Sequence, residues 1–118
     1  MKMKTSELTG AALAYAAAQI TPDLMQVGLC FYIRDAESGE RVLFNPAENW
    51  SQAGPIIERE HICTTVEHSG VWIAYSMWNY ADEKRFMCSG PTPLVAAMRA
   101  FVASNLGDEV EVPGELAP

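Results

Sequence analysis

The feature that most constrains this chain is a helix signal in its last third. Thr92 can accept a hydrogen bond at a helix start, and Pro93 suits the first turn, where no N–H donor is needed. Gly107 is a typical helix terminator. Between them, apolar residues recur with a period near 3.6, at Leu94, Val95, Met98, Phe101 and Val102. The pattern predicts an apolar helix from about 92 to 106 that other elements must cover.

The segment 71–78 has the clearest strand pattern. Its alternation puts Val71, Ile73, Tyr75 and Met77 on one face and Trp72, Ala74, Ser76 and Trp78 on the other. Both faces are largely apolar, which fits a central strand covered on both sides or a strand with a ligand pocket on one side. Segments 61–66, 29–33 and 41–44 are also strand-like, and the last two form a predicted hairpin.

A helix is also predicted near the N-terminus, over about 5–20. Thr5 or Ser6 can cap it, and Pro22 cannot continue it. The segment 45–60 contains Pro46, Gly54 and Pro55, which argue against any long element there.

These elements predict an α+β fold with a small, mainly antiparallel sheet packed with two helices. The sequence divides into a single domain over residues 1–107 and an acidic C-terminal tail over 108–118. A chain this short has few elements to cover both the apolar helix and the apolar strand, which predicts a homodimer or higher symmetric oligomer. The alternative is a monomer in which the first helix covers one face of the strand and the second helix covers the other.

Charge limits the partners. The net charge is −7, so general DNA or RNA binding is not expected. After Arg99 there is no basic residue, and the carboxylates there are Asp108, Glu109, Glu111 and Glu115. This stretch is either a solvated, partly disordered tail or a surface that mimics nucleic acid or docks on a basic partner.

Cysteine usage and hydropathy indicate a cytoplasmic protein. Cys30, Cys63 and Cys88 cannot all pair internally, so three free and buried thiols are expected. No apolar run is long enough to span a membrane, and no signal core follows the N-terminal lysines. The histidines and cysteines lack metal-ligand spacing, and Cys88-Ser89 lies outside any nucleophile-elbow motif. We therefore expect no metal, no cofactor and no enzymatic activity.

Two segments together predict a ligand site. Trp50 offers a stacking face, Gln52 an amide, and Arg59 a planar fork for phosphate or carboxylate. The start of the late helix favours an anion. The complete candidate set is Trp50, Gln52, Gly54, Pro55, Arg59, Trp72, Gly90, Pro91, Thr92 and Arg99. The alternative is that the apolar members are core and that Arg59 pairs with a neighbouring glutamate or the tail.

Three blocks carry a family resemblance, namely 4–10, 49–60 and 90–113. The chain resembles the NinX-like phage proteins in these blocks. It departs from them at Ala14-Tyr15, where the family usually has Asp-Trp, at Ala53, usually a second glycine, and at Asn49, usually acidic. The resemblance implies a phage or prophage accessory protein in the host cytoplasm, and it implies no established catalytic residue.

The residues and the resemblance together predict a function. We expect a protein that binds a small nucleotide-like ligand without catalysis and sequesters a host immune signalling nucleotide. The alternative is an acidic inhibitor, or nucleic-acid mimic, that acts on a host protein.

Overall fold

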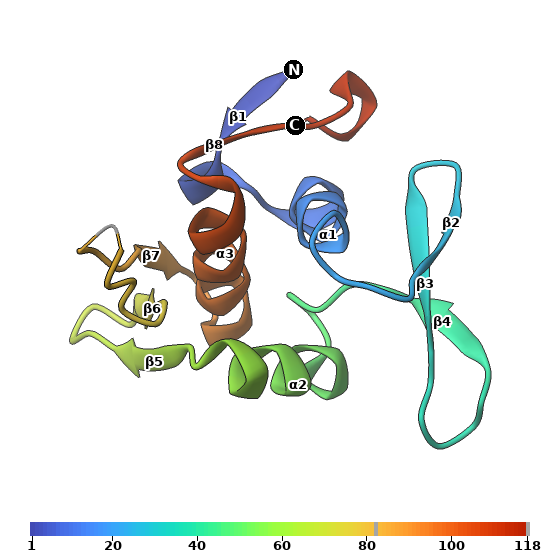
Figure 1. The fold of residues 1–118 in the computed structure, drawn as a ribbon, viewed down its shortest axis with the longest axis horizontal. Coiled ribbons are helices and arrows are strands. Elements are labelled where there is room, and N and C mark those ends of the chain that lie inside the picture. Colours follow the sequence, from blue (N-terminus) through green and yellow to red (C-terminus); the bar gives the residue numbers. More distant parts are fainter. Residues whose placement is uncertain (82, 118) are drawn as a thin grey trace.

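The computed structural model describes residues 1–81 and 83–117, which form an α+β fold (Figure 1). Within them lie three helices and three small antiparallel sheets. The helices are α1 (Gly10–Ala18), α2 (Trp50–Glu60) and α3 (Pro93–Leu106). The expectation of a single sheet with two helices is therefore too simple, although the α+β class is confirmed.

Helix α3 is the central element, and its predicted limits are confirmed. The Thr92 hydroxyl accepts a hydrogen bond from the Val95 N–H at 3.2 Å, Pro93 occupies the first turn, and Gly107 ends the helix. Every residue from Ala96 to Ala103 is buried. Figure 1 shows the other elements arranged around α3, so the two ends of the sequence and its middle share one core.

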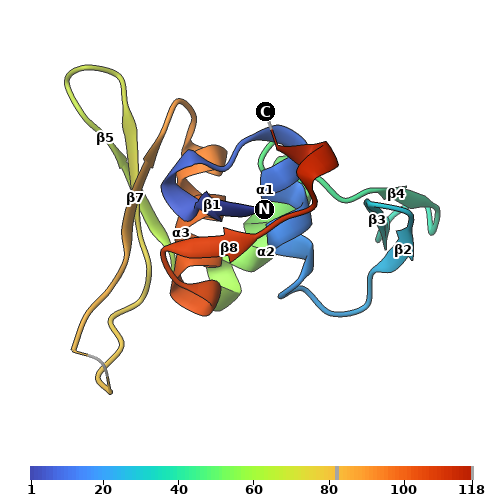
Figure 2. The same ribbon diagram turned by 90° about the horizontal axis from the view of Figure 1, so that it is seen from above.

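The largest cover of α3 is a sheet with the strand order β5-β6-β7. Its strands are β5 (Cys63–Val66), β6 (Trp72–Tyr75) and β7 (Met87–Gly90). The predicted alternation in β6 is confirmed: Trp72 and Ala74 pack against the core, whereas Ile73 and Tyr75 face away from it. Figure 2 shows this sheet at the edge of the molecule, with α3 on only one of its sides. β6 is thus a central strand with a helix packed on one face only; on the other face neighbouring side chains still leave Ile73 only 7% exposed.

A second sheet, β2-β3-β4, lies on the opposite side of the molecule (Figure 1). The predicted hairpin is confirmed as β3 (Cys30–Arg34) and β4 (Arg41–Leu43), and the sequence did not predict β2 (Met25–Val27). An edge-to-face contact between Tyr15 and Phe31, with ring centroids 5.8 Å apart, joins this sheet to α1.

The chain ends pair with each other, as β1 (Lys2–Lys4) and β8 (Glu109–Glu111). Val110 and Val112 are buried, and a short 3₁₀ turn, η2 (Gly114–Leu116), follows. The expectation of a partly disordered tail is therefore wrong for residues 109–112. The two buried valines alternate with the exposed glutamates, which is how an acidic segment can still form a half-buried strand.

The N-terminal helix is shorter than predicted. Thr5 and Ser6 belong to a 3₁₀ turn, η1 (Thr5–Glu7), and α1 begins after Thr9. Thr5 is buried instead of capping a helix, and its hydroxyl donates to the Gly107 carbonyl at 2.7 Å. The hydroxyl that the sequence assigns to a local cap thus fixes the end of α3.

Helix α2 occupies the segment that was expected to be irregular. Asn49 caps it by accepting a hydrogen bond from the Ser51 N–H at 3.0 Å. Pro55 lies inside the helix but on its exposed face, while Ala53 and Ile56 are buried. Burial of this side therefore outweighs the missing N–H of Pro55.

The three cysteines are free, but only Cys88 is buried. Cys30 and Cys63 are exposed on sheet strands, so the expectation of three buried thiols is wrong for two of them. In residues 1–81 and 83–117, no helix combines the length and apolar character that crossing a bilayer requires.

Candidate functional site

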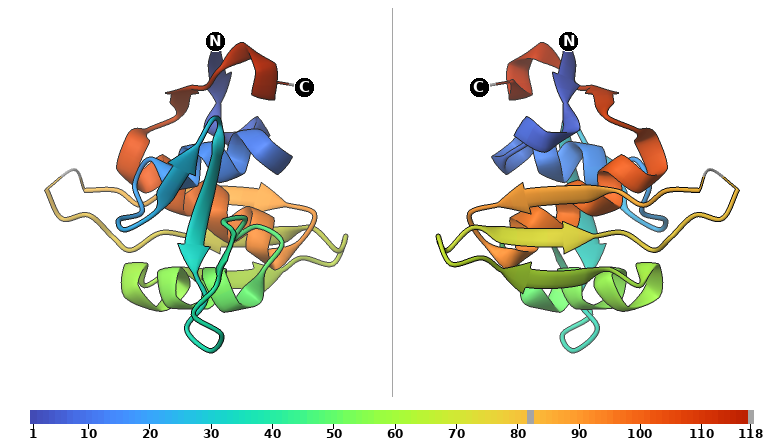
Figure 3. Two further views of the ribbon diagram at one scale, coloured as in Figure 1. Left: turned by 90° about the vertical axis from the view of Figure 1, so that its right-hand side faces the viewer. Right: turned by 90° about the vertical axis from the view of Figure 1, so that its left-hand side faces the viewer.

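A groove of about 480 Å³ lies where the end of α2, the end of α3 and the segment after β6 meet. We call it the Arg59 groove. Its described lining residues are Arg59, Glu60, Ser76, Met77, Trp78, Asn79, Tyr80, Ala81, Ser104 and Asn105. Figure 3 shows the described parts of the β6–β7 connection extending beyond the sheet. Residues 77–81 of this connection line the groove.

Two aromatic residues form one wall of the groove. Trp78 is 43% exposed and Tyr80 is 86% exposed, and their ring centroids lie 6.4 Å apart in an edge-to-face arrangement. Trp78 continues the alternation of β6, which carries it to the same side as α3. Such exposed rings offer a planar ligand a surface on which to stack.

Arg59 supplies a cation between the helices. Its guanidinium carbon lies 5.9 Å from the centre of the buried Phe101 ring, and its Nε donates to a Glu60 carboxylate oxygen at 3.1 Å. The Arg59 side chain remains 48% exposed. Within the described part of the chain, neither of its terminal nitrogens donates a hydrogen bond, so both can reach a ligand. The predicted pairing of Arg59 with a neighbouring glutamate is confirmed, and it leaves the fork accessible.

Arg59 also borders a second depression, the α2 cleft, which lies between α2 and the β2-β3-β4 sheet. It has a volume of about 560 Å³ and includes Gln52, Pro55 and Arg59 from the predicted site. The remaining lining residues are Thr21, Pro22, Asp23, Ile33, Arg34, Asp35, Ala36, Glu37, Phe44, Ser51 and Ile56. Three carboxylates against two arginines make this cleft a poor place for an anion.

The Gln52 amide is fully used within the protein. Its oxygen accepts from the Asn45 N–H at 2.7 Å, and its nitrogen donates to the Leu43 carbonyl at 2.8 Å. Gln52 thereby ties α2 to the end of β4. Both hydrogen bonds would be lost if the amide turned to a ligand.

Arg99 has a structural position as well. It is buried, its Nε donates to the Leu8 carbonyl at 2.8 Å, and one terminal nitrogen donates to the Ser89 carbonyl at 2.8 Å. Burial lowers the pKa of Arg99, and the nearby Cys88 acts in the opposite direction. Burial also raises the pKa of the Cys88 thiol, which the charge of Arg99 partly offsets. Arg99 therefore joins the N-terminal segment to β7 from inside the core.

The residues at the start of α3 are likewise distant from Arg59 in the fold. A side chain at Gly90 would place its Cβ 2.8 Å from the Ala96 backbone nitrogen, so this glycine allows β7 to approach α3. Pro91 lies in the short connection to the Thr92 cap. The Arg59 groove meets α3 at its other end, at Ser104 and Asn105.

The two remaining tryptophans of the chain do not line the groove. Trp50 is 62% exposed at the start of α2, and Trp72 packs against the core. Gly54 lies inside α2 with open space around it. Of the residues predicted from the sequence, the groove therefore contains Arg59, and it adds Trp78 and Tyr80, which are not in the predicted set. The face that Trp78 shares with Trp72 was a usable signal for Trp78.

The acidic C-terminal segment is partly neutralised by the N-terminus. In the register of β1 and β8, Lys2 lies opposite Glu111 and Lys4 opposite Glu109. The terminal amine of Met1 lies 2.8 Å from a Glu111 oxygen, and this hydrogen bond lowers the pKa of Glu111. The arrangement weakens the case for a bare acidic surface that imitates nucleic acid.

Residues 1–81 and 83–117 contain no group of three or more histidine, cysteine or acidic side chains that could hold a metal ion. A family model described as "Bacteriophage P22, NinX" matches residues 4–105. The matched range includes α1, α2, all of α3 except Leu106, and every described lining residue of the Arg59 groove. No curated protein sequence matches the chain.

Proposed function

We propose that this chain, which belongs to the bacteriophage P22 NinX family, binds a small nucleotide-like ligand in the Arg59 groove. One observation carries the proposal: Arg59, from α2, lines the same groove as Trp78 and Tyr80, which both come from the segment after β6. A cationic fork beside two exposed rings suits a ligand with an anionic group and a planar base.

The energetics fit a small ligand. Stacking of a base on an aromatic side chain contributes about 1–3 kcal/mol, and a groove of about 480 Å³ is within the usual range for small-molecule sites. Arg59 contributes a charge-assisted hydrogen bond at short range. The net charge of −7 acts at longer range and disfavours extended polyanions, so a small ligand is preferred over DNA or RNA.

The proposed role is sequestration without catalysis. The described lining of the groove includes neither histidine nor cysteine. The Ser76 hydroxyl is held between the Phe86 N–H, from which it accepts at 2.8 Å, and the Met77 carbonyl, to which it donates. A phage protein with such a groove can lower the free concentration of a host signalling nucleotide by binding it.

Calorimetry with a panel of mononucleotides, ADP-ribose and cyclic dinucleotides tests the proposal. We expect one class to bind at micromolar concentration, and Trp78→Ala and Arg59→Ala each to weaken that binding at least about tenfold. Trp50→Ala is the matched control, because it removes another exposed tryptophan ring, one that lies outside the groove.

Two results would reject the ligand proposal. One is that no member of the panel binds. The other is that Trp50→Ala weakens binding as much as Trp78→Ala does, since the groove would then not be the site.

A further inference from the structure

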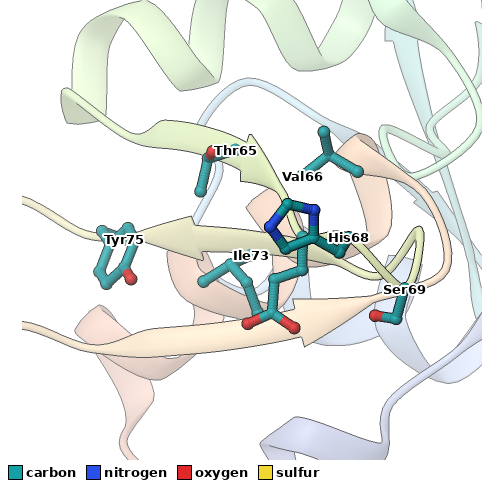
Figure 4. A pocket seen from close by; sticks show the side chains of 7 residues that line it. Thr65, Val66, His68, Ser69, Ile73 and Tyr75 are labelled. Atoms are coloured by element: carbon teal, nitrogen blue, oxygen red, sulfur yellow. The ribbon is translucent and has the colours of Figure 1, made fainter.

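We infer that the outer face of the β5-β6-β7 sheet is the interface of a symmetric homodimer, in which the second copy is reversed end to end along the strands. The outer face is the side of this sheet that points away from α3. Figure 3, right, looks onto it, and no other element of the chain lies in front of the strands. Figure 4 shows Thr65, Ile73 and Tyr75 on this face.

The strand positions on the outer face are uncharged, and the central one, Ile73, is only 7% exposed. Strand pairing and alternation place on this face Cys63, Thr65, Val71, Ile73, Tyr75, Met87 and Ser89. Met87 is 62% exposed, and Val71 is also exposed. In a chain with 15 acidic and 8 basic residues, this row of uncharged strand positions lets two copies approach without bringing strand carboxylates together.

Opposite charges mark the two ends of this face. Glu67 follows β5 at the turn end of β6, and it lines a shallow depression on this face together with His68 and Ser69. Figure 4 labels His68 and Ser69 at this end. At the other end Arg85 lies over the Tyr75 ring, with its guanidinium carbon 4.4 Å from the ring centre. In the described part of the chain, neither Glu67 nor Arg85 is in an ion pair.

This charge pattern favours a second copy as the occupant. A two-fold axis that lies in the interface and crosses the strands near Ile73 places each Arg85 opposite the partner's Glu67, and does so twice. Sheets packed face to face lie about 10 Å apart, a separation that long arginine and glutamate side chains at the rim can bridge. The exposed side chains of Val71 and Met87 supply apolar area for the contact, and the charged ends set its direction.

Light scattering of the full chain at micromolar concentration tests the dimer, with a mass of twice 12.9 kDa expected. Glu67→Arg and Arg85→Glu each place like charges opposite each other. Each is expected to raise the dimer dissociation constant by about tenfold or more. The double variant Glu67→Arg with Arg85→Glu exchanges the two ends and is expected to restore the dimer.

Arg41→Glu is the control, because Arg41 lies in the β2-β3-β4 sheet and should not change the mass. Circular dichroism confirms that each variant is folded. A monomeric wild type overturns the inference. If Glu67→Arg and Arg85→Glu both dimerise as tightly as the wild type, the outer face is not the interface. If the double variant stays monomeric, the two copies are not reversed end to end. None of these outcomes depends on ligand binding.

Discussion

The two faces of the β5-β6-β7 sheet differ in what they do for the molecule. The inner face, which carries Trp72, Ala74 and Cys88, is sealed against α3 and belongs to the core. The outer face has no helix or strand packed on it: Val71 and Met87 are exposed there, although neighbouring side chains leave Ile73 only 7% exposed. The difference shows that a strand with apolar residues on both faces does not need a helix or sheet of the same chain packed against each face.

The inner face also leads into the candidate site. Trp78 continues the inner side of β6 beyond the sheet and so reaches the Arg59 groove, where Ser104 and Asn105 of α3 also lie. The packing of the inner face on α3 therefore both stabilises the domain and positions the residues that line the groove. We therefore expect inner-face substitutions to damage stability and binding together, whereas outer-face substitutions affect association alone.

The sharpest way to break this comparison is to place one charge on each face. Ala74 is fully buried, so Ala74→Asp buries a carboxylate in a closely packed site and should cost about 4 kcal/mol or more, enough to unfold the chain. Ser89→Asp puts the same group on the outer face and should change stability by about 0.5 kcal/mol or less. Urea unfolding at low protein concentration measures both.

A similar loss of stability for both variants would contradict the distinction between the faces. It would mean that the outer face is also packed against something within the same chain. Repeating the unfolding at higher protein concentration separates an effect on folding from an effect on dimerisation, because only dimerisation depends on protein concentration.

A second prediction sharpens the comparison at the contact of β7 with α3. Gly90→Ala drives a methyl group to 2.8 Å from the Ala96 backbone nitrogen, so one element must shift, at a cost of about 1–3 kcal/mol. Gly54→Ala is the control, since open space surrounds Gly54 within α2. That change should stabilise the protein by about 0.5–1 kcal/mol. Thermal unfolding compares the two, and a stabilised Gly90→Ala would contradict the close approach of β7.

Sequence reasoning succeeded where local signals and tertiary burial agree. At α3, the Thr92 cap, Pro93 and Gly107 mark the same limits that the core imposes. It failed at α2, because Gly54 and Pro55 are local helix breakers while the burial of Ala53 and Ile56 is a property of the whole fold.

The candidate site was only partly predictable for the same reason. The sequence predicted an arginine beside an aromatic surface, and the groove contains residues of both types. The sequence, however, assigned the aromatic surface to Trp50 and Trp72. Trp78 and Tyr80 reach Arg59 because both α2 and the sheet pack on α3. The position of α2 relative to the β5-β6-β7 sheet depends on how each packs on α3, and no periodic pattern in the sequence indicates it.

The smallest predicted effect concerns the cap that made α3 recognisable. Thr92→Ala removes the hydroxyl that accepts from the Val95 N–H and should cost about 1 kcal/mol. Thr92→Ser keeps an oxygen in the same place and should recover most of that loss. Because the Arg59 groove touches only the far end of α3, ligand affinity should stay within about twofold in both variants while the protein remains folded. If Thr92→Ala loses ligand affinity while Thr92→Ser does not, the start of α3 would belong to the binding site. Calorimetry measures the affinity and thermal unfolding measures the stability of each variant.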